Sequence, residues 1–393
     1  MLPVIETELQ YQKKILKEIY KGCPSLKRVA LKDLIAAFEQ GKILYLEGLS
    51  LPAFRFKRDW RGFPAGTVIA PGFFMPGFPH IPRIFVLRTG IPRYLHGPFY
   101  AEEKIEGYNV RLANLAGEIK AFTRRGYVCP FATDRWPDFL PRLPEFFERH
   151  PHRVICCEVA GPENPFVSEW PPHVKEDVGF FCFDILDLSQ RKFLPPAEKY
   201  ALLREFGFPT PEINGPFSPE KIDTIKEVLK SYEEEGREGV VLKPADPSSG
   251  RVIKYVTANS NISDLRVAFP YIGELEPNYI VHRLVRMVIT RWELAEDFDP
   301  EFYRKVGEAL FSDMPALLEK IARGQPVEEV FRIRLRREES LEALLSHFRA
   351  AQVRIEIRHK EWQGGYLRVE FAKIYPRATS FWATKLEGLA QVD

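Results

Sequence analysis

The hydrophobic periodicity of this chain changes near residue 259, and that change constrains the fold more than any other feature. Between about residues 99 and 257, short runs of β-branched and aromatic residues alternate with two helical stretches, at 136–150 and 219–235. Downstream, apolar residues recur at helical spacing over 279–294 and 300–322. The sequence therefore predicts an α+β domain around a mixed or antiparallel sheet, followed by a helical unit.

Short strands are expected throughout the first region. Their predicted positions are 108–112, 154–159, 180–185, 240–243 and 252–256. Nearer the N-terminus, apolar spacing predicts two helices within 9–40, and the segment 51–97, rich in proline, glycine and aromatic residues, predicts short strands joined by turns.

The last part of the chain has a pattern of its own. Alternation of apolar and charged residues predicts a small sheet with one buried face, because successive side chains of a strand point to opposite sides. Its strands are expected at 331–335, 353–357 and 366–371, with a helix at 340–350.

Length and composition limit the class of protein. A chain of 393 residues exceeds what one hydrophobic core usually organises, so several compact units are expected. Hydrophobic residues make up 45% and charged residues 28%, and no apolar run approaches the roughly 20 residues of a membrane span. The N-terminus has no secretory signal pattern, so we expect a cytoplasmic protein without a membrane partner.

Charge and cysteine content limit the kinds of binding site that the chain can form. The net charge is only +2, so a nucleic-acid partner would have to bind a local basic surface. The five cysteines include no CxxC pair, which argues against both a zinc site and a disulfide framework.

The most informative string is Lys104-Ile-Glu-Gly-Tyr-Asn109, which follows two glutamates. Alone, a lysine beside acids and before a glycine is a common surface hairpin. Five further short strings follow it in order: Thr123-Arg-Arg-Gly, Glu158-Val-Ala-Gly, Phe180-Phe-Cys-Phe-Asp-Ile, Glu238-Gly-Val-Val-Leu-Lys and Ile253-Lys. Such a set in a fixed order is hard to obtain by chance.

This order resembles the covalent nucleotidyltransferase superfamily of DNA ligases, RNA ligases and mRNA capping enzymes, whose signature is Lys-x-Asp-Gly followed by four further motifs. The resemblance spans about residues 99–256. Asn109, two residues after the motif glycine, is typical of the RNA ligases. The arrangement of the whole chain is similar to the archaeal homodimeric ATP-dependent RNA ligases that circularise RNA.

The resemblance implies an α+β fold with a ligase-type nucleotidyltransferase domain of mixed and antiparallel sheets with flanking helices. It divides the chain into four domains. These are an N-terminal α/β domain (1–65), the nucleotidyltransferase domain (66–258), a helical dimerisation domain (259–325) and a C-terminal α+β domain (326–393).

The chemistry explains why these residue types are needed. Phosphoryl transfer to an enzyme amine requires a lysine that is partly deprotonated near neutral pH, which burial and neighbouring cations promote, and Lys104 is the candidate. Attack on the α-phosphate of ATP expels pyrophosphate, so cations must meet the charge on the phosphate oxygens. The resemblance assigns this task to Lys243 and Lys254.

The remaining site residues also follow from the resemblance. Glu158 would contact the ribose and Glu238 the metal, and both carboxylates are candidates for holding Mg²⁺, which prefers oxygen ligands. Phe180 would stack on the adenine ring. Glu103 and Arg124 belong to the nucleotide site, with Arg124 on the ribose or phosphate, and Asn109 would position the activated 5′ end. Each of these residues, taken alone, also suits an ordinary core or strand position.

Two departures from the family pattern stand out. Glu106 replaces the usual motif aspartate. The last motif, usually Lys-x-Lys, supplies only Lys254 here, and Arg251 is a candidate for the missing cation.

Two weaker signals lie outside the motifs. The segment 54–61 interleaves aromatic residues and cations, a composition used to bind single-stranded nucleic acid but also found in amphipathic strands. His150 and His152 match no common metal-ligand spacing, and a solvated helix end explains them better.

The sequence thus predicts an ATP-dependent RNA ligase that joins 5′-phosphate and 3′-hydroxyl ends of single-stranded RNA through a lysyl-AMP on Lys104 and an RNA-adenylate. When both ends belong to one molecule, the expected product is a circle. Mg²⁺ is the expected metal, and a homodimer the expected assembly. The alternatives are a DNA ligase, a GTP-dependent capping-type enzyme, or an inactive relative that only binds nucleotide or RNA.

Overall fold

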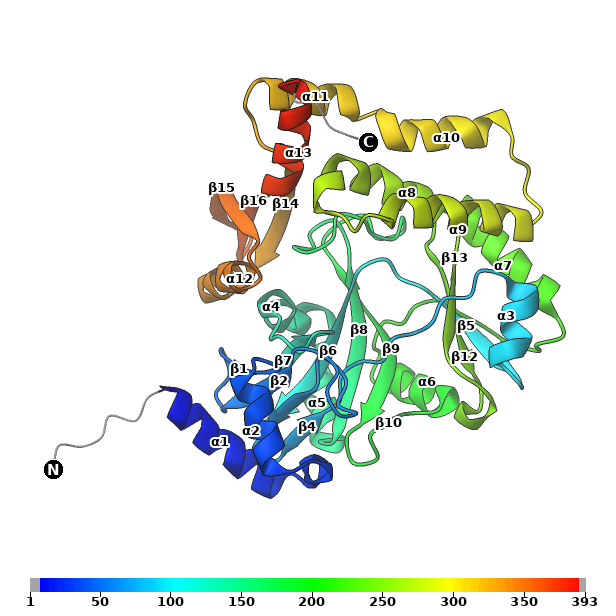
Figure 1. Cartoon of the computed structure of the whole chain (residues 1–393). Coiled ribbons are helices and arrows are strands. Elements are labelled where there is room, and N and C mark those ends of the chain that lie inside the picture. Colours follow the sequence, from blue (N-terminus) through cyan, green and yellow to red (C-terminus); the bar gives the residue numbers. More distant parts are fainter. Residues whose placement is uncertain (1–7, 389–393) are drawn as a thin grey trace.

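The computed structural model describes residues 8–388, which form four antiparallel sheets and the helices that pack on them (Figure 1). The N-terminal sheet has the strand order β1-β2-β3-β4. These strands are β1 (Ile43–Leu46), β2 (Ala53–Phe56), β3 (Val68–Ala70) and β4 (Phe73–Met75). Helices α1 (Glu8–Gly22) and α2 (Leu31–Glu39), joined by the 3₁₀ helix η1 (Pro24–Arg28), bury their apolar side chains against it and confirm the two predicted helices.

Two sheets at the centre of the molecule contain the motifs that follow one another in the sequence. The first, in the order β10-β9-β8-β6-β7, consists of β6 (Tyr108–Leu115), β7 (Glu118–Thr123), β8 (Arg153–Ala160), β9 (Gly179–Asp187) and β10 (Lys192–Phe193). The second, in the order β11-β5-β12-β13, consists of β5 (Phe99–Glu103), β11 (Ile213–Phe217), β12 (Gly239–Pro244) and β13 (Ile253–Val256). All five strands predicted in this region are present.

Helices cover these two sheets. Leu87 and Ile91 of α3 (Leu87–Tyr94), together with Ile225 and Leu229 of α7 (Ile222–Glu234), share a core with the second sheet. The first sheet packs on α4 (Pro130–Phe139), α5 (Leu143–Arg149) and α6 (Pro196–Glu205). A short 3₁₀ turn, η2 (Pro247–Ser249), leads into β13.

Two predicted helices are wrong because proline interrupts them. The expected helix at 136–150 is split into α4 and α5: Leu140 precedes Pro141 and has the non-helical angles φ −130° and ψ 58°. A residue before proline is disfavoured in the helical region, so α4 ends there. The expected helix at 300–322 is likewise split into α10 (Pro300–Phe311) and α11 (Met314–Ala322), with Pro315 in the first turn of the second helix.

The helical unit lies above the two central sheets in Figure 1. It contains α8 (Ala258–Ala268), the 3₁₀ helix η3 (Phe269–Glu274), α9 (Tyr279–Glu293) and α10, whose core side chains include Leu265, Met287 and Phe302. Among the described residues, no helix is long and apolar enough to cross a membrane. The positions of α8 and α13 (Pro376–Leu386) were not predicted.

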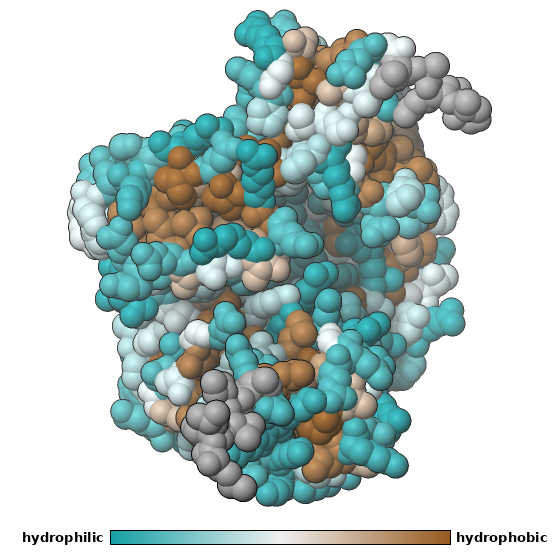
Figure 2. All heavy atoms as spheres, turned by 60° about the vertical axis from the view of Figure 1, so that its left-hand side comes forward, coloured by the Kyte–Doolittle hydropathy of each residue, from teal (hydrophilic) through white to brown (hydrophobic). Residues whose placement is uncertain are grey.

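The C-terminal sheet has the order β14-β16-β15, with β14 (Glu328–Leu335), β15 (Arg354–Gln363) and β16 (Tyr366–Ile374). Its apolar face is covered by α12 (Glu338–Ala350), as the alternating pattern predicted. The same core continues without a break into the first central sheet. Figure 2 shows this side of the molecule: hydrophobic residues lie in separate patches among hydrophilic ones, and the surface is hollowed near its middle.

One buried carboxylate fastens the C-terminal unit to α4. Asp134 is 2% exposed. Its carboxylate accepts hydrogen bonds from the Arg336 backbone N–H (2.6 Å), the Ser340 hydroxyl (2.7 Å) and Arg337 Nε (3.3 Å). Next to it, Arg135 donates to the carbonyl oxygen of Arg334 (2.9 Å) and to Asp177 (2.8 Å). Because unpaired buried polar groups are costly, these contacts fix where α12 begins.

Replacement of Asp134 by alanine is expected to loosen this attachment. The change leaves the Arg336 N–H and the Ser340 hydroxyl without acceptors, at a cost of about 2–3 kcal/mol. Amide hydrogen exchange should become faster in β14 and α12, while Glu148→Ala on the exposed side of α5 should change nothing. Unchanged protection of α12 in Asp134→Ala would contradict this account.

Candidate active site

Lys104 lies at the point where the two central sheets face each other. It follows β5 directly, and its backbone N–H donates to the carbonyl oxygen of Gly239 (2.8 Å), which fixes the end of β5 against the start of β12. Two glycines permit this approach. A Cβ on Gly107 would lie 2.5 Å from the carbonyl oxygen of Val159, and one on Gly239, where φ is +146°, would lie 2.3 Å from that of Tyr255.

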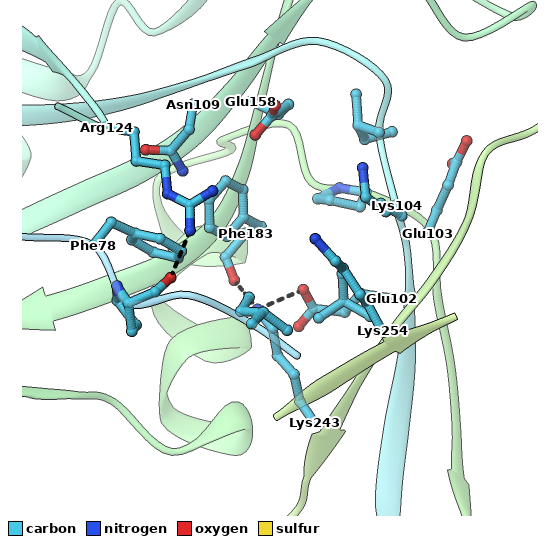
Figure 3. Close-up of a pocket in the computed structure, with 15 residues that line it drawn as sticks. Phe78, Glu102, Glu103, Lys104, Asn109, Arg124, Glu158, Phe183, Lys243 and Lys254 are labelled. Carbon is cyan, nitrogen blue, oxygen red and sulfur yellow. Dashed lines mark hydrogen bonds and ion pairs between the residues drawn. The ribbon is translucent and has the colours of Figure 1, made fainter. Parts of the chain in front are cut away.

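A cavity opens beside Lys104 (Figure 3). It brings together most of the residues predicted from the sequence. Its lining includes Glu103, Lys104, Asn109, Arg124, Glu158, Lys243 and Lys254, together with Phe78 and Phe183. Glu238 stands at the same place, because its carboxylate pairs with the ammonium of Lys104.

The charge state of Lys104 differs from the expectation. Burial acts to lower its pKa, but the carboxylates of Glu238, Glu158 and Glu106 outweigh burial, and the pKa is raised. The prediction that burial and cations hold this amine partly deprotonated is therefore wrong for the protein without substrate. Carboxylates, not cations, dominate its surroundings, and attack by this amine requires the ion pair with Glu238 to be broken.

Glu158 and Asn109 face the cavity from neighbouring strands. They are paired across β8 and β6. Burial, with Glu238 adding repulsion, raises the pKa of Glu158 to about 8 even though Lys104 acts in the opposite direction. The side-chain oxygen of Asn109 is buried and, among the described residues, accepts no hydrogen bond. A buried polar atom without a partner, aimed into a cavity, is suited to a ligand that supplies the missing bond.

Arg124 lines the cavity next to Asn109 (Figure 3). It donates to the carbonyl oxygen of Pro79 (3.1 Å) and lies 3.0 Å from His80 Nδ1. Burial lowers its pKa, and the nearby carboxylate of Glu158 acts against that. Glu103 lies at the rim, where Arg237 Nη1 is 3.3 Å from its carboxylate and where burial raises its pKa.

Lys243 is held in a buried network of charges. Its ammonium contacts three acceptors: Glu102 (2.8 Å), Asp184 (3.0 Å) and the carbonyl oxygen of Phe183 (2.8 Å). An ammonium has three N–H donors, so none is left for a phosphate while this arrangement lasts. Lys199, 1% exposed, completes the network by donating to Glu102 and to the same Phe183 carbonyl oxygen (2.8 Å).

Lys254 is the lysine whose ammonium remains available. It makes no hydrogen bond or ion pair with its side chain among residues 8–388, and Figure 3 shows it pointing into the same space as Lys104. Burial, together with repulsion from Lys104 and Arg83, lowers its pKa to about 8. Arg251, predicted as a candidate for the missing motif cation, is exposed and does not line the cavity.

The prediction for Phe180 is corrected by the structure. Phe180 is 1% exposed and stacks on Phe139 in the core, with ring centroids 5.3 Å apart. Alternate side chains of a strand point to opposite faces, so Phe183, an odd number of residues further along β9, faces the cavity instead. Its ring meets Phe78 edge to face at 5.7 Å.

Carboxylates that suit a metal occur in two places. Glu158 and Glu238, the predicted ligands, flank Lys104. A second group was missed by the sequence: carboxylate oxygens of Glu106, Glu169 and Asp264 lie within 4.8 Å of one another. Burial, with repulsion from Glu238, raises the pKa of Glu106 to about 9. Glu169 and Asp264 belong to no recognised string, so only the fold reveals their proximity.

The weaker sequence signals have structural explanations. Phe54 and Phe56 in the segment 54–61 are fully buried in the N-terminal core and cannot stack on bases. His150 follows the last residue of α5, and its ring packs against Phe146 and edge to face against Phe206, as expected for a helix end.

The raised pKa of Glu158 predicts how stability depends on pH. The folded protein keeps this proton up to about pH 8, whereas an unfolded chain releases it near pH 4.5. The free energy of unfolding should therefore fall as pH rises from about 5 to about 8, by at most about 1.4 kcal/mol per pH unit from this group. Glu158→Gln should remove that part of the slope in denaturant titrations. Parallel curves for the two proteins would show that Glu158 is already ionised.

Comparison with known proteins agrees with this geometry. The family model for RNA ligase matches residues 97–256, and the model for the ligase Pab1020 C-terminal region matches 267–389. An archaeal ATP-dependent RNA ligase is 30% identical, with a TM-score of 0.86, covering 96% of this chain and 99% of the other. A protein from Aquifex aeolicus, provisionally called an ATP-dependent DNA ligase, is 34% identical, with a TM-score of 0.87, covering 92% and 100% of the two chains.

A further relative extends the comparison to a protein without a described activity. An uncharacterized protein of Methanocaldococcus jannaschii is 28% identical over 92% of this chain and 94% of its own length. The RNA ligase model covers the strands that surround Lys104, and the archaeal RNA ligases match almost the whole chain. This chain therefore belongs to the family of ATP-dependent RNA ligases and is a ligase enzyme.

Proposed function

We propose that this enzyme joins a 5′-phosphate and a 3′-hydroxyl of RNA through a covalent lysyl-AMP on Lys104. The observation that carries the proposal is the placement of Lys104 at a cavity that offers an aromatic pair at one side and an unpaired lysine at the other. Nucleotide bases bind to apolar aromatic faces, and phosphates bind to cations. The archaeal relatives and the RNA ligase model support the same reaction class.

In the first step, Nζ of Lys104 bonds to the α-phosphorus of ATP, and the bond from that phosphorus to the bridging oxygen breaks to release pyrophosphate. Lys104 must first lose a proton, and the carboxylate of Glu238, which pairs with its ammonium, is the group that accepts this proton. Lys254 meets the charge on the phosphate oxygens, and Phe183 takes the base-stacking role first assigned to Phe180. Mg²⁺, held through Glu158 and Glu238, would add positive charge at the same oxygens.

Lys243 has a different part in this proposal from the one first predicted. Its three donors are occupied by Glu102, Asp184 and the Phe183 carbonyl oxygen. It therefore orients the strand that carries Phe183, and contacts the nucleotide only if that network opens.

Two RNA steps follow. AMP passes from Lys104 to the RNA 5′-phosphate and forms a 5′-5′ pyrophosphate, with Asn109 positioned to bind the activated end. The 3′-hydroxyl then attacks that phosphate and displaces AMP. When both ends belong to one molecule the product is a circle, which the high effective concentration of the second end favours.

The first step is tested by label transfer. Incubation with α-labelled ATP and Mg²⁺, followed by denaturation and electrophoresis, should leave label on the wild type and none on Lys104→Ala, because no other side chain can replace the nucleophile. Arg88→Gln, on the exposed side of α3, is a control that should label normally. Label on Lys104→Ala would refute the assignment.

The acceptor and the nucleotide are tested in the same assay. The name given to the Aquifex aeolicus relative makes a DNA ligase the second candidate, and sealing of nicked DNA but not of single-stranded RNA would favour it. Label from GTP would indicate a capping-type enzyme. Absence of any label would favour a relative that only binds nucleotide.

We also propose that the protein is a homodimer joined through α9. Four apolar residues of this helix, spaced for one face, are exposed: Val281 (54%), Val285 (49%), Val288 (49%) and Trp292 (68%). Tyr303 and Phe311 of α10 are exposed as well, each at 60%. Monomers rarely expose apolar faces of this kind, and a second copy pairing the same face around a two-fold axis would bury it.

Two charges placed on this face should separate the copies. Val285→Arg with Val288→Arg is expected to give a monomer in size-exclusion chromatography with light scattering, because paired arginines would have to be buried against each other. Val330→Arg, at an exposed position of β14 (48%), is the matched control and should remain dimeric. A wild-type monomer would rule out this assembly.

A further inference from the structure

A row of cations continues beyond the cavity. It starts at Lys254, which lines the cavity, and passes to Arg83 through backbone hydrogen bonds: Lys254 N–H donates to the Pro82 carbonyl oxygen (2.9 Å), and Ile84 N–H donates to that of Lys254 (3.0 Å). Arg83 and Lys254 thus form a parallel bridge. Arg83 itself is half-buried and lies outside the cavity lining.

Helix α9 brings a third cation to this row. The Thr290 hydroxyl donates to the carbonyl oxygen of Val256 on β13 (3.4 Å), and Arg283 Nε donates to Asp264 (2.9 Å). Arg286 lies three residues after Arg283 and four before Thr290, so all three side chains are on the same face of α9. This face is opposite the exposed apolar one.

Arg83 and Arg286 are unpaired within the part of the chain that the structure describes. Among residues 8–388, neither guanidinium makes a hydrogen bond, an ion pair or a cation–π contact, and Nε of Arg286 is fully buried without an acceptor. Burial, with Arg286 next in importance, lowers the pKa of Arg83, and burial followed by Arg283 lowers that of Arg286. The carboxylates of Glu238 and Asp264 oppose these shifts, but Glu238 already pairs with Lys104 and Asp264 with Arg283. Clustered cations of this kind favour the binding of an anion.

We propose that Arg83 and Arg286 form a binding site for the β- and γ-phosphates of the nucleoside triphosphate, which leave as pyrophosphate. The inference rests on the proposed function, because it takes the α-phosphate to lie between Lys104 and Lys254. Phosphates beyond the α-phosphate must then extend outward, and the cations that continue the row are these two arginines. A guanidinium binds phosphate oxygens in pairs, so two suit a polyphosphate.

The site also explains how a motif with one lysine suffices. Lys254 alone replaces the usual pair, and Arg83 is attached to it through the backbone. A single RNA phosphate would engage only one of the two guanidiniums fully, whereas pyrophosphate carries enough charge to neutralise both. Because Arg286 belongs to α9, the helical unit completes the nucleotide site of the same chain.

Equilibrium binding tests this without requiring any transfer. The probes are AMP and a triphosphate analogue with a methylene group between the α- and β-phosphorus atoms, each with Mg²⁺, measured by calorimetry on the full-length protein. Arg83→Gln and Arg286→Gln should each weaken analogue binding about tenfold and leave AMP binding unchanged. Arg88→Gln, an equal loss of charge on the nearby exposed surface, should leave both unchanged.

A stability measurement separates this role from a structural one. Within residues 8–388 neither guanidinium has a hydrogen-bond partner to lose, so both glutamine variants should keep or raise the Tm. Arg83→Lys, which retains the charge without the fork, should bind the analogue with intermediate affinity. Intermediate affinity with an unchanged Tm supports the site.

Three results would overturn the inference. The first is unchanged analogue binding in both glutamine variants. The second is equal weakening of AMP and analogue, which indicates a structural role. The third is unchanged analogue binding together with a weaker preference than the wild type for 5′-phosphorylated over 5′-hydroxyl RNA. That result would assign the arginines to RNA. A wild type that prefers the analogue over AMP but forms no lysyl-AMP would contradict the proposed function and leave this site standing.

Discussion

The buried network of Glu102, Lys199, Lys243 and Asp184 is the interaction on which the site depends. Its members come from both central sheets and from α6, and charges buried this deeply are tolerated only when each is paired. The paired lysines hold the pKa of Glu102 at about 2, even though burial alone would raise it. Glu102 on β5 and Lys243 on β12 belong to one sheet, and Asp184 on β9 belongs to the other. The network therefore sets the separation of the two sheets and the width of the cavity between them.

Lys104, the proposed nucleophile, shows the opposite balance of charge. Lys104 is surrounded by more carboxylates than cations, and its amine stays protonated in the absence of substrate. Burial, together with repulsion from Glu238, leaves protons on Glu106 and Glu158 near neutral pH, as expected of acids that cannot all ionise together.

Residues inside short local strings were predictable, and those defined by tertiary contact were not. Lys104, Asn109, Glu158 and Lys254 were identified because they belong to short contiguous strings that match the family motifs, and the structure places all four at the cavity. Phe180 was misassigned because the family pattern does not state which face of β9 a phenylalanine occupies, and only packing against Phe139 decides that. Arg83, Arg286 and Asp264 carry no local pattern. They become neighbours only when α9 packs on β13.

The hydrophobic core that runs from the first central sheet into the C-terminal sheet has a consequence for cooperativity. Two units that share one core, with Asp134 pinned beneath α12, do not unfold independently. By thermodynamic linkage, a nucleotide that binds near Lys104 then raises the free energy of unfolding of strands far from the site as well. A substitution in β14 or β16 that never touches a ligand would accordingly shift nucleotide affinity through the population of the folded state.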